Sequence, residues 1–155
     1  MKIRRIIGAG AAVAFLLVTA VPALAASPEV DTWSNDVDVP YLDCGTFEAH
    51  GVWTVSHRLT IYFDQAGTPI KDHEIVDFRG AFVNPDTGAS IPDSGRSIYF
   101  DTLAPDYSFL TTVMTGVRHS AYLHAAGRSD FQTGAHHGID RFDAGVMAAC
   151  DALGA

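Results

Sequence analysis

Positive charge is scarce in this sequence. Its 155 residues include ten Lys and Arg against 18 Asp and Glu, and the formal net charge is −8 at pH 7. Proteins that bind nucleic acid use Lys and Arg to neutralise phosphates, and an acidic surface repels the phosphate backbone. Nucleic acid is therefore not expected among the partners of this protein.

Motifs of the common catalytic and cofactor-binding classes are also missing. The sequence has no Gly-x-Ser-x-Gly nucleophile elbow, no Ser-x-x-Lys, no phosphate-binding loop and no dinucleotide fingerprint. Its two cysteines lack the Cys-x-x-Cys spacing of zinc and redox motifs, and its two tryptophans are too few and too far apart for a carbohydrate platform. The sequence therefore implies no cofactor, and it weighs against an enzyme without excluding one.

Residues 1–25 have the pattern of a secretory signal peptide. Three cations near the start precede an uncharged apolar run at residues 6–21. Small residues at Ala23 and Ala25 then form a cleavage site. An uncleaved membrane anchor is the alternative, because the run approaches the roughly 20 residues that a spanning helix needs. Pro22 interrupts a helix and no charged flank follows, so we expect cleavage after Ala25, secretion, and no membrane span in the mature chain.

Cleavage increases the acidity of what remains. The three cations of the signal are lost with it, which takes the formal net charge from −8 to −11. Residues 26–43 are polar and acidic, with two prolines and no sustained period, so we expect a flexible acidic leader there. Residues 44–155 are long enough for one β domain with its own core. Cys44 and Cys150 lie near the two ends of this domain, and in an oxidising compartment we expect them to form a disulfide.

Alternation of apolar and polar residues predicts β-strands through most of the domain. The clearest strands are expected at residues 52–63, 70–83, 97–102, 109–117 and 121–127. Turn sequences separate them, such as Asn84-Pro85-Asp86-Thr87-Gly88. From Asp143 onward, apolar residues recur at helical spacing and predict a short C-terminal helix with Asp143 as its N-cap.

These elements predict an all-β fold: an antiparallel meander of six to eight strands with a short C-terminal helix and one disulfide. A closed barrel and a sandwich both remain open, and we favour the barrel. Position parity then assigns the side chains that should face the interior. They are Trp53, Val55, Leu59, Ile61, Phe63, Val76, Phe78, Phe82, Ile98, Phe100, Phe109, Val113 and Val117.

Several turn and cysteine positions form a pattern shared with a known group of proteins. The positions are Cys44, Gly45, Phe47, Asn84, Pro85, Thr87, Gly88, Gly127 and Cys150. On these residues the chain resembles a group of small secreted proteins from high-GC Gram-positive bacteria, and the resemblance implies a fold rather than an activity. More loosely, the expected architecture is similar to lipocalin-type barrels, whose Gly-x-Trp opening has a formal match at Gly51-Val52-Trp53. That likeness implies an apolar ligand.

Two histidines are the best candidates for a site inside the domain. His57 and His119 each share parity with apolar positions of their strands, so both should point inward. A buried imidazole needs a hydrogen-bond partner, so the two predict either satisfied core histidines or a pocket. Asp72 and Glu74 share the inward parity of Val76 and could reach them. Together the two histidines and two carboxyls form the candidate ligand-binding set, suited to orienting a ligand or to acid–base chemistry.

Two further histidine-containing segments are weaker metal candidates. His136, His137 and Asp140 supply imidazole and carboxylate ligands on a loop, although adjacent histidines on a loop usually diverge. The segment from His73 to Asp77 is one residue from the helical zincin pattern, but residues four apart on a strand are too distant to chelate one ion. We therefore expect no metal centre.

Three functions are consistent with these observations. The first is a secreted binding protein that holds a small apolar ligand inside a barrel, with His57 and His119 near the polar end of the pocket. The second is a structural or interaction protein of the envelope, with a filled core and an exposed apolar patch or an unpaired edge strand. The third is a small isomerase, cyclase or hydrolase, which requires an imidazole within hydrogen-bond reach of a carboxylate and open to solvent.

Overall fold

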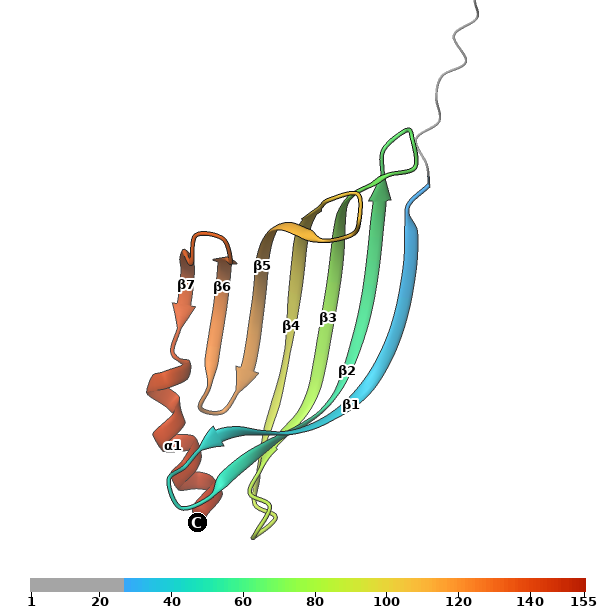
Figure 1. Ribbon diagram of the computed structural model, residues 1–155. Coiled ribbons are helices and arrows are strands. Elements are labelled where there is room, and N and C mark those ends of the chain that lie inside the picture. Colours follow the sequence, from blue (N-terminus) through green and yellow to red (C-terminus); the bar gives the residue numbers. More distant parts are fainter. Residues whose placement is uncertain (1–26) are drawn as a thin grey trace, which may run out of the picture.

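The computed structural model describes residues 27–155, so the predicted signal peptide lies outside the described residues. Seven strands form one antiparallel sheet in which neighbours in sequence are neighbours in space (Figure 1). The elements are β1 (Glu29–Asp43), β2 (Glu48–Phe63), β3 (Pro69–Val83), β4 (Ser90–Leu103), β5 (Phe109–Ser120), β6 (His124–Asp130), β7 (His136–Asp140) and α1 (Phe142–Gly154). The predicted all-β meander with one C-terminal helix is confirmed.

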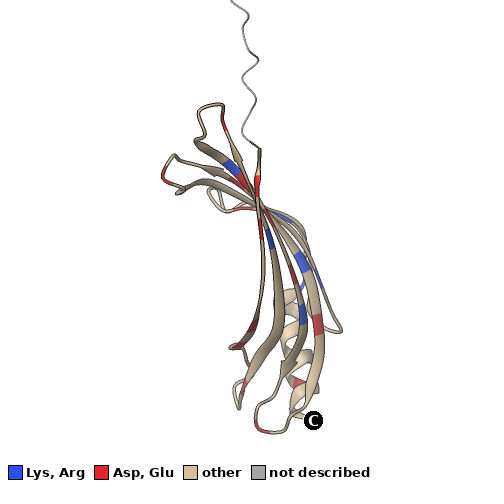
Figure 2. Cartoon of the chain, turned by 90° about the vertical axis from the view of Figure 1, so that its right-hand side faces the viewer, with Lys and Arg blue, Asp and Glu red and all other residues tan. Residues whose placement is uncertain are grey.

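The sheet is not closed, so it does not form the barrel that the sequence favoured. Its order runs from β1 to β7, and these two strands are its edges. Closing a barrel would require β7 to pair with β1. The two strands are poorly matched in length, because β7 has five residues, all of them exposed, and β1 has 15. The sheet instead curves around α1 at the end that carries the C-terminus (Figure 2). Within residues 27–155, no helix is long and apolar enough to span a bilayer.

The expected flexible leader is wrong for residues 29–43, which form strand β1. This strand pairs with β2 along its whole length, from Glu29 opposite Ile61 to Asp43 opposite Glu48. Most of its side chains are exposed, so it lacks the burial period by which a strand is recognised in a sequence. Ladder hydrogen bonds to β2, rather than burial of a face, hold it in the sheet.

Inward parity is confirmed for the core positions of β2 and β3 but not for β4 and β5. Trp53 and Phe82 are buried in the core as expected. On β4, however, Ser97 lies opposite Val76 and therefore shares its concave face, which turns Ile98 and Phe100 to the other face. The same register turns Val113 and Val117 away from the concave face, while Met114, Gly116 and Arg118 point toward it. Phe109 lies beyond a register shift of the β4–β5 ladder and is 66% exposed, so its predicted burial is wrong too. The prediction from parity is wrong on β4 and β5 because their larger apolar side chains lie on the convex face of the curved sheet.

The hydrophobic core occupies one end of the concave face, beneath α1. It consists of Leu42, Ala49, Trp53, Phe82, Ile91, Leu123, Ala149 and Leu153. Two glycines make room for the indole of Trp53. A Cβ on Gly51 would lie 1.8 Å from a ring carbon of Trp53, and one on Gly80 would lie 2.9 Å from another. Both positions must therefore be glycine, because a side chain at either would clash with the indole of Trp53.

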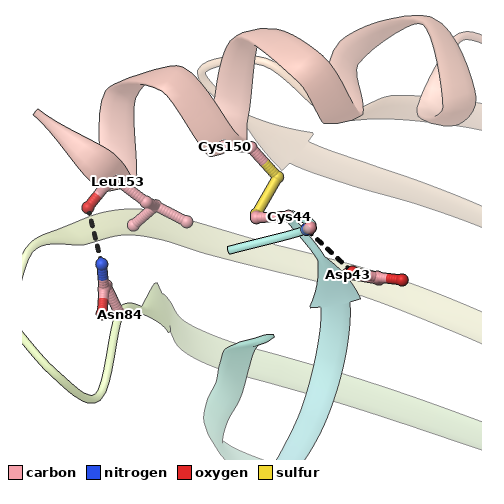
Figure 3. Close-up of a disulfide and its surroundings, with 6 residues drawn as sticks. Asp43, Cys44, Asn84, Cys150 and Leu153 are labelled. Carbon is pink, nitrogen blue, oxygen red and sulfur yellow. Dashed lines mark hydrogen bonds between the residues drawn. A yellow bond between two sulfur atoms is a disulfide. The ribbon is translucent and has the colours of Figure 1, made fainter. Parts of the chain in front are cut away.

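The predicted disulfide is confirmed and fastens α1 to the end of β1 (Figure 3). Cys44 and Cys150 have their Cα atoms 5.4 Å apart and are separated by 106 residues. Near it, Asn84 Nδ2 donates a hydrogen bond of 3.1 Å to the carbonyl of Leu153, which ties the β3–β4 turn to the last turn of the helix. The predicted N-cap is wrong, because Arg141 occupies that position and Asp143 lies in the first helical turn.

Removing the disulfide should lower the stability of the domain strongly. We expect the Cys44→Ser/Cys150→Ser variant to lose about 3–5 kcal/mol in the free energy of unfolding, because the cross-link restricts a long loop in the unfolded chain. Urea denaturation followed by circular dichroism measures this loss, and the reduced wild-type protein is the control. Equal urea midpoints for the variant and the oxidised wild type would contradict the expectation.

Candidate functional site

An open cavity of about 410 Å³ lies on the concave face, next to the core. Apolar side chains supply most of its wall: Trp53, Val55, Val76, Phe78 and Met114. A volume of this size is within the range of sites for small organic ligands, which are also mainly apolar. The cavity is therefore the candidate functional site of the domain.

Small residues on successive strands create this cavity. Val76 lies opposite Ser97, Ser97 opposite Gly116, and Gly116 opposite Gly127, so one cross-strand row runs from a valine to two glycines. Side chains in such a row stand on the same face of a sheet. Because this row becomes smaller from β3 to β6, the concave face is hollowed there instead of being filled.

A buried ion pair bounds the cavity on the side of the core. Arg118 Nη2 donates to Asp93 Oδ2 at 2.7 Å, and the side chain of Asp93 is fully buried. The same carboxylate oxygen accepts a 2.8 Å hydrogen bond from Trp53 Nε1. Arg118 Nη1 donates to the hydroxyl of Tyr41 at 2.9 Å. The charge of the arginine is thus neutralised and its donors are used inside the protein, which is what a buried charge requires.

Aromatic rings surround the guanidinium of Arg118. Its central carbon lies 5.1 to 5.5 Å from the ring centroids of Tyr41, Trp53, Phe78, Phe82 and Phe142. Cations are attracted to ring faces at such distances, most strongly where water is excluded. Sequence reasoning missed both Arg118 and Asp93, because parity had assigned Val117 rather than its neighbour to the interior.

Polar side chains line the cavity away from the ion pair. Ser129 Oγ and His136 Nδ1 are hydrogen-bonded to each other at 2.9 Å. Ser97 and Tyr99 contribute hydroxyls to the wall. Burial raises the pKa of the Tyr99 phenol above its ordinary value, and the charge of nearby Glu74 raises it further. Tyr99 therefore stays protonated at neutral pH and can donate a hydrogen bond.

The structure brings together two of the four predicted ligand-binding residues. His57 Nδ1 lies 2.8 Å from Glu74 Oε1, with the two side chains 19% and 25% exposed. The ring of Trp33 stacks on the imidazole with centroids 4.6 Å apart. His57 lies opposite Val76 in the β2–β3 register, so the pair lies beside the cavity rather than in its wall. The inward orientation of His57 agrees with the sequence prediction, and Glu74 is the one of the two candidate carboxyls that reaches it.

His119 does not belong to this site, and its predicted inward orientation is wrong. It is exposed, and it lies opposite Ser94 and His124 on the face of the sheet that points away from the cavity. The reason is the parity error on β5, since Arg118 takes the concave side and its neighbour must take the other.

Asp72 points to the concave face as predicted, but its neighbour is another carboxyl rather than a histidine. It is buried and lies opposite buried Asp101 in the β3–β4 register. An oxygen of each side chain, Oδ1 in both cases, has no hydrogen-bond partner among residues 27–155. Burial raises the pKa of Asp72 to about 7, and the adjacent Asp101 raises it further in the same direction. The pair lies beyond Glu74 on the side away from the core.

The weaker metal candidates do not converge. His136 is bonded to Ser129, and Asp140 Oδ1 accepts the backbone N–H of Phe142 at 3.0 Å. His137 follows His136 on strand β7, so their side chains point to opposite faces. Throughout the described part of the chain, no three His, Cys, Asp or Glu side chains are grouped in a way that could hold a metal ion.

A second cavity of about 460 Å³ is lined mainly by charged and hydroxyl-bearing residues, among them Lys71, Asp72, Asp101, Thr102 and Arg128. Phe100 is the single aromatic residue in its wall, whereas Tyr41, Trp53, Phe78 and Tyr99 line the first cavity. The first cavity is therefore the better site for a small organic ligand.

No protein-family model, curated protein or solved structure matches this chain. Functional inference therefore rests on the geometry of the concave face alone.

Breaking the buried ion pair should destabilise the fold. We expect Asp93→Asn to lower the free energy of unfolding by about 3–5 kcal/mol, because it leaves the guanidinium of Arg118 buried without its counter-charge. Asp77→Asn is the matched control, since it breaks an Arg96–Asp77 pair whose side chains are 57% and 47% exposed. That variant should leave the unfolding free energy nearly unchanged. Denaturant titrations of both variants measure the difference, and equal losses would contradict the assignment.

Asp72 should make stability depend on pH between about 4 and 7. Its pKa is raised in the folded state to about 7, whereas an unfolded chain has an ordinary aspartate pKa near 4. The folded state therefore holds the proton more tightly, and its contribution to stability is present below about pH 4 and is lost as the pH rises to about 7. Asp72→Asn should flatten this part of the profile of unfolding free energy against pH. An unchanged slope in the variant would show that another group titrates.

Proposed function

We propose that this protein binds a small, uncharged, mainly apolar molecule in the concave cavity, and that it does so as a secreted protein. The observation that carries the proposal is a hollow of about 410 Å³ beside a packed aromatic core. A purely structural domain gains stability by filling such a space, because unfilled volume forfeits packing contacts. Secretion rests on the sequence pattern of residues 1–25 and agrees with the disulfide.

The charges around the cavity favour an uncharged ligand. Arg118 is the cation in its wall, and Asp93 already neutralises it at 2.7 Å. A carboxylate ligand would have to leave water without gaining a free counter-ion, which is costly in an apolar site. An ammonium ligand would meet the same cost, because Asp93 is fully buried and bonded to Arg118 and Trp53.

The hydroxyl-bearing part of the wall suits the polar end of such a ligand. Ser97, Tyr99 and Ser129 offer donors and acceptors without charge. A ligand with one hydroxyl or carbonyl group could place it here and lay its apolar part along Val55, Val76 and Phe78. A few polar groups that fix the orientation of a mainly apolar ligand are usual in such sites.

A small acid–base enzyme is the second candidate, and one observation favours it. The contact of 2.8 Å between His57 and Glu74 is the imidazole–carboxylate arrangement that this hypothesis requires, and the pair is partly exposed. It lies next to the cavity through Val76. The stacked ring of Trp33, however, covers one face of the imidazole, which is also how a purely structural histidine is held.

A substitution that fills the cavity with a larger side chain should weaken ligand binding. With 1-dodecanol as the probe, we expect saturable binding, detected by a change in tryptophan fluorescence and by an added mass in native mass spectrometry. Val76→Phe places a larger side chain in the wall and should weaken binding at least tenfold. Val52→Phe is the matched control, because Val52 is exposed on the other face of β2. Dodecanoate should bind at least tenfold more weakly than dodecanol, since the site lacks a free cation.

Either of two results would contradict the binding proposal. One is that Val76→Phe binds dodecanol as tightly as the wild type does, and the other is that dodecanoate binds more tightly than dodecanol. Thermal melts of each variant show whether lost binding reflects a lost fold.

A substitution at His57 separates the two candidate functions. His57→Gln should leave the affinity for dodecanol within twofold of the wild-type value, because the imidazole lies outside the cavity wall. The enzyme hypothesis predicts instead that a ligand of this site is converted by the wild type and not by the variant. Incubating the wild type and the variant with the ligand, and then analysing the ligand by mass spectrometry, distinguishes the two functions.

A further inference from the structure

The second cavity, of about 460 Å³, is lined by two cations, Lys71 and Arg128. Cations are few in the part of the chain that the structure describes. Without the three at residues 2, 4 and 5, seven of the ten Lys and Arg remain, against 18 Asp and Glu. An acidic chain repels anions in general, so an anion can bind only where cations gather without acidic partners. The surroundings of Lys71 and Arg128 therefore decide whether this cavity can hold one.

Neither of these two cations is neutralised by an ion pair. The salt bridges among residues 27–155 use Arg96, Arg118 and two histidines as their cations. Lys71 Nζ lies 4.6 Å from the ring centroid of Tyr62, a contact that holds the ammonium group without neutralising it. The side chains of Lys71 and Arg128 are both exposed, so their N–H donors are accessible to a ligand.

One carboxylate near Arg128 is engaged in its own turn. Asp130 Oδ1 accepts the backbone N–H groups of Gln132 and Thr133, both at 3.0 Å. Hydrogen bonds from Thr133 lower the pKa of Asp130 most, and the charge of Arg128 lowers it by a smaller amount. No salt bridge within residues 27–155 joins Arg128 to Asp130. The guanidinium therefore keeps its donors for another acceptor.

The side chains that line this cavity stand on one face of the sheet, apart from those of Asp72 and Asp101. They occupy three neighbouring cross-strand rows, at alternate positions of each strand, and such positions share a face. The rows are Lys71, Thr102 and Thr111, then Phe100 and Val113, then Thr115 and Arg128. Asp72 and Asp101 lie opposite each other between two of these rows, so their carboxyls point to the concave face instead.

The two cations flank an apolar floor. Phe100 and Val113 form the middle row, and Phe100 is 46% exposed although one face of its ring stacks on His73 with centroids 4.8 Å apart. By register, Lys71 and Arg128 are separated by three strand spacings and by four residues along the strands, which is about 14 Å across the sheet and about 13 Å along it. Their long side chains can therefore approach a ligand from its two ends.

Hydroxyl groups add neutral donors to the same wall. Thr111 Oγ1 donates a hydrogen bond of 2.8 Å to Thr102 Oγ1, so the proton of the Thr102 hydroxyl remains available to a ligand. Thr102 lies between Lys71 and Thr111 in its row, which places this donor beside the ammonium group. An anionic group held at Lys71 can accept from both.

From this arrangement we propose that the second cavity binds a small organic dianion, with one carboxylate at Lys71, the other at Arg128, and an apolar middle over Phe100 and Val113. Such a ligand gains charge-assisted hydrogen bonds at both ends, and the guanidinium can hold its carboxylate through two parallel bonds. An uncharged ligand suits the concave cavity instead, where Asp93 neutralises the arginine. The two cavities share no lining residue, so each proposal stands without the other.

Equilibrium dialysis with 2,6-naphthalenedicarboxylate tests the proposal. We expect saturable binding by the wild type, and at least tenfold weaker binding by Lys71→Gln/Arg128→Gln, because that variant removes both charge-assisted contacts. Arg58→Gln/Arg79→Gln is the matched control. It removes the same charge from the same face of the sheet, at two residues outside the cavity wall. This control should bind within twofold of the wild type, and urea midpoints of both variants show that the fold is kept.

Changes to the ligand test the need for two charges. The uncharged dimethyl ester of the same acid should bind at least tenfold more weakly than the dicarboxylate, and 2-naphthoate, with one carboxylate, at least threefold more weakly. Val76→Phe, which fills the concave cavity, should bind the dicarboxylate as the wild type does. Four results would each overturn the proposal: no saturable binding by the wild type up to about 1 mM, equal losses in the two double variants, an ester that binds as tightly as the acid, or lost binding in Val76→Phe.

Discussion

The ion pair between Arg118 and Asp93 is the interaction on which the arrangement of the concave face depends. It joins β4 to β5, and the rings around the guanidinium belong to β1, β2, β3 and α1. One charged group thus contacts most of the elements that pack at this end of the sheet. A charge in such a place is stable only when every partner is present, so the pair selects one arrangement of strands and helix. It also forms the polar boundary at which the packed core ends and the cavity begins.

The sequence predicted the antiparallel meander, the C-terminal helix and the disulfide, because alternation, turn residues and cysteine position are local signals. Strand β1 was missed since its side chains are mostly exposed and only its backbone pairing identifies it. On β4 and β5 the larger apolar side chains lie outside the curve, so parity placed His119 in the interior and overlooked Arg118. The sequence placed His57 and Glu74 on one face because parity on β2 and β3 is right, and only the register of the β2–β3 hairpin shows that they are in contact.

The open sheet gives the two ends of the molecule different physical characters. At one end, α1 covers the core and the disulfide fixes it to the end of β1. At the other, three hairpins carry exposed aromatic and aliphatic side chains on turns that aspartates hold in shape. Between them, the row from Val76 to Gly127 leaves the concave face hollow. A short β7 is compatible with this arrangement, because the helix rather than another strand shields the buried end.

The position of the cross-link also determines how the protein withstands proteolysis. Cys44 and Cys150 are separated by 106 positions, and the loop that they close includes every strand except β1 and all the hairpin turns. A protease that cuts once within this loop produces two pieces that stay covalently attached, and the remaining ladder hydrogen bonds can keep them in register. Such a nicked molecule keeps its mass until it is reduced. The single disulfide therefore protects the covalent integrity of residues 44–150, not only of the helix that it touches.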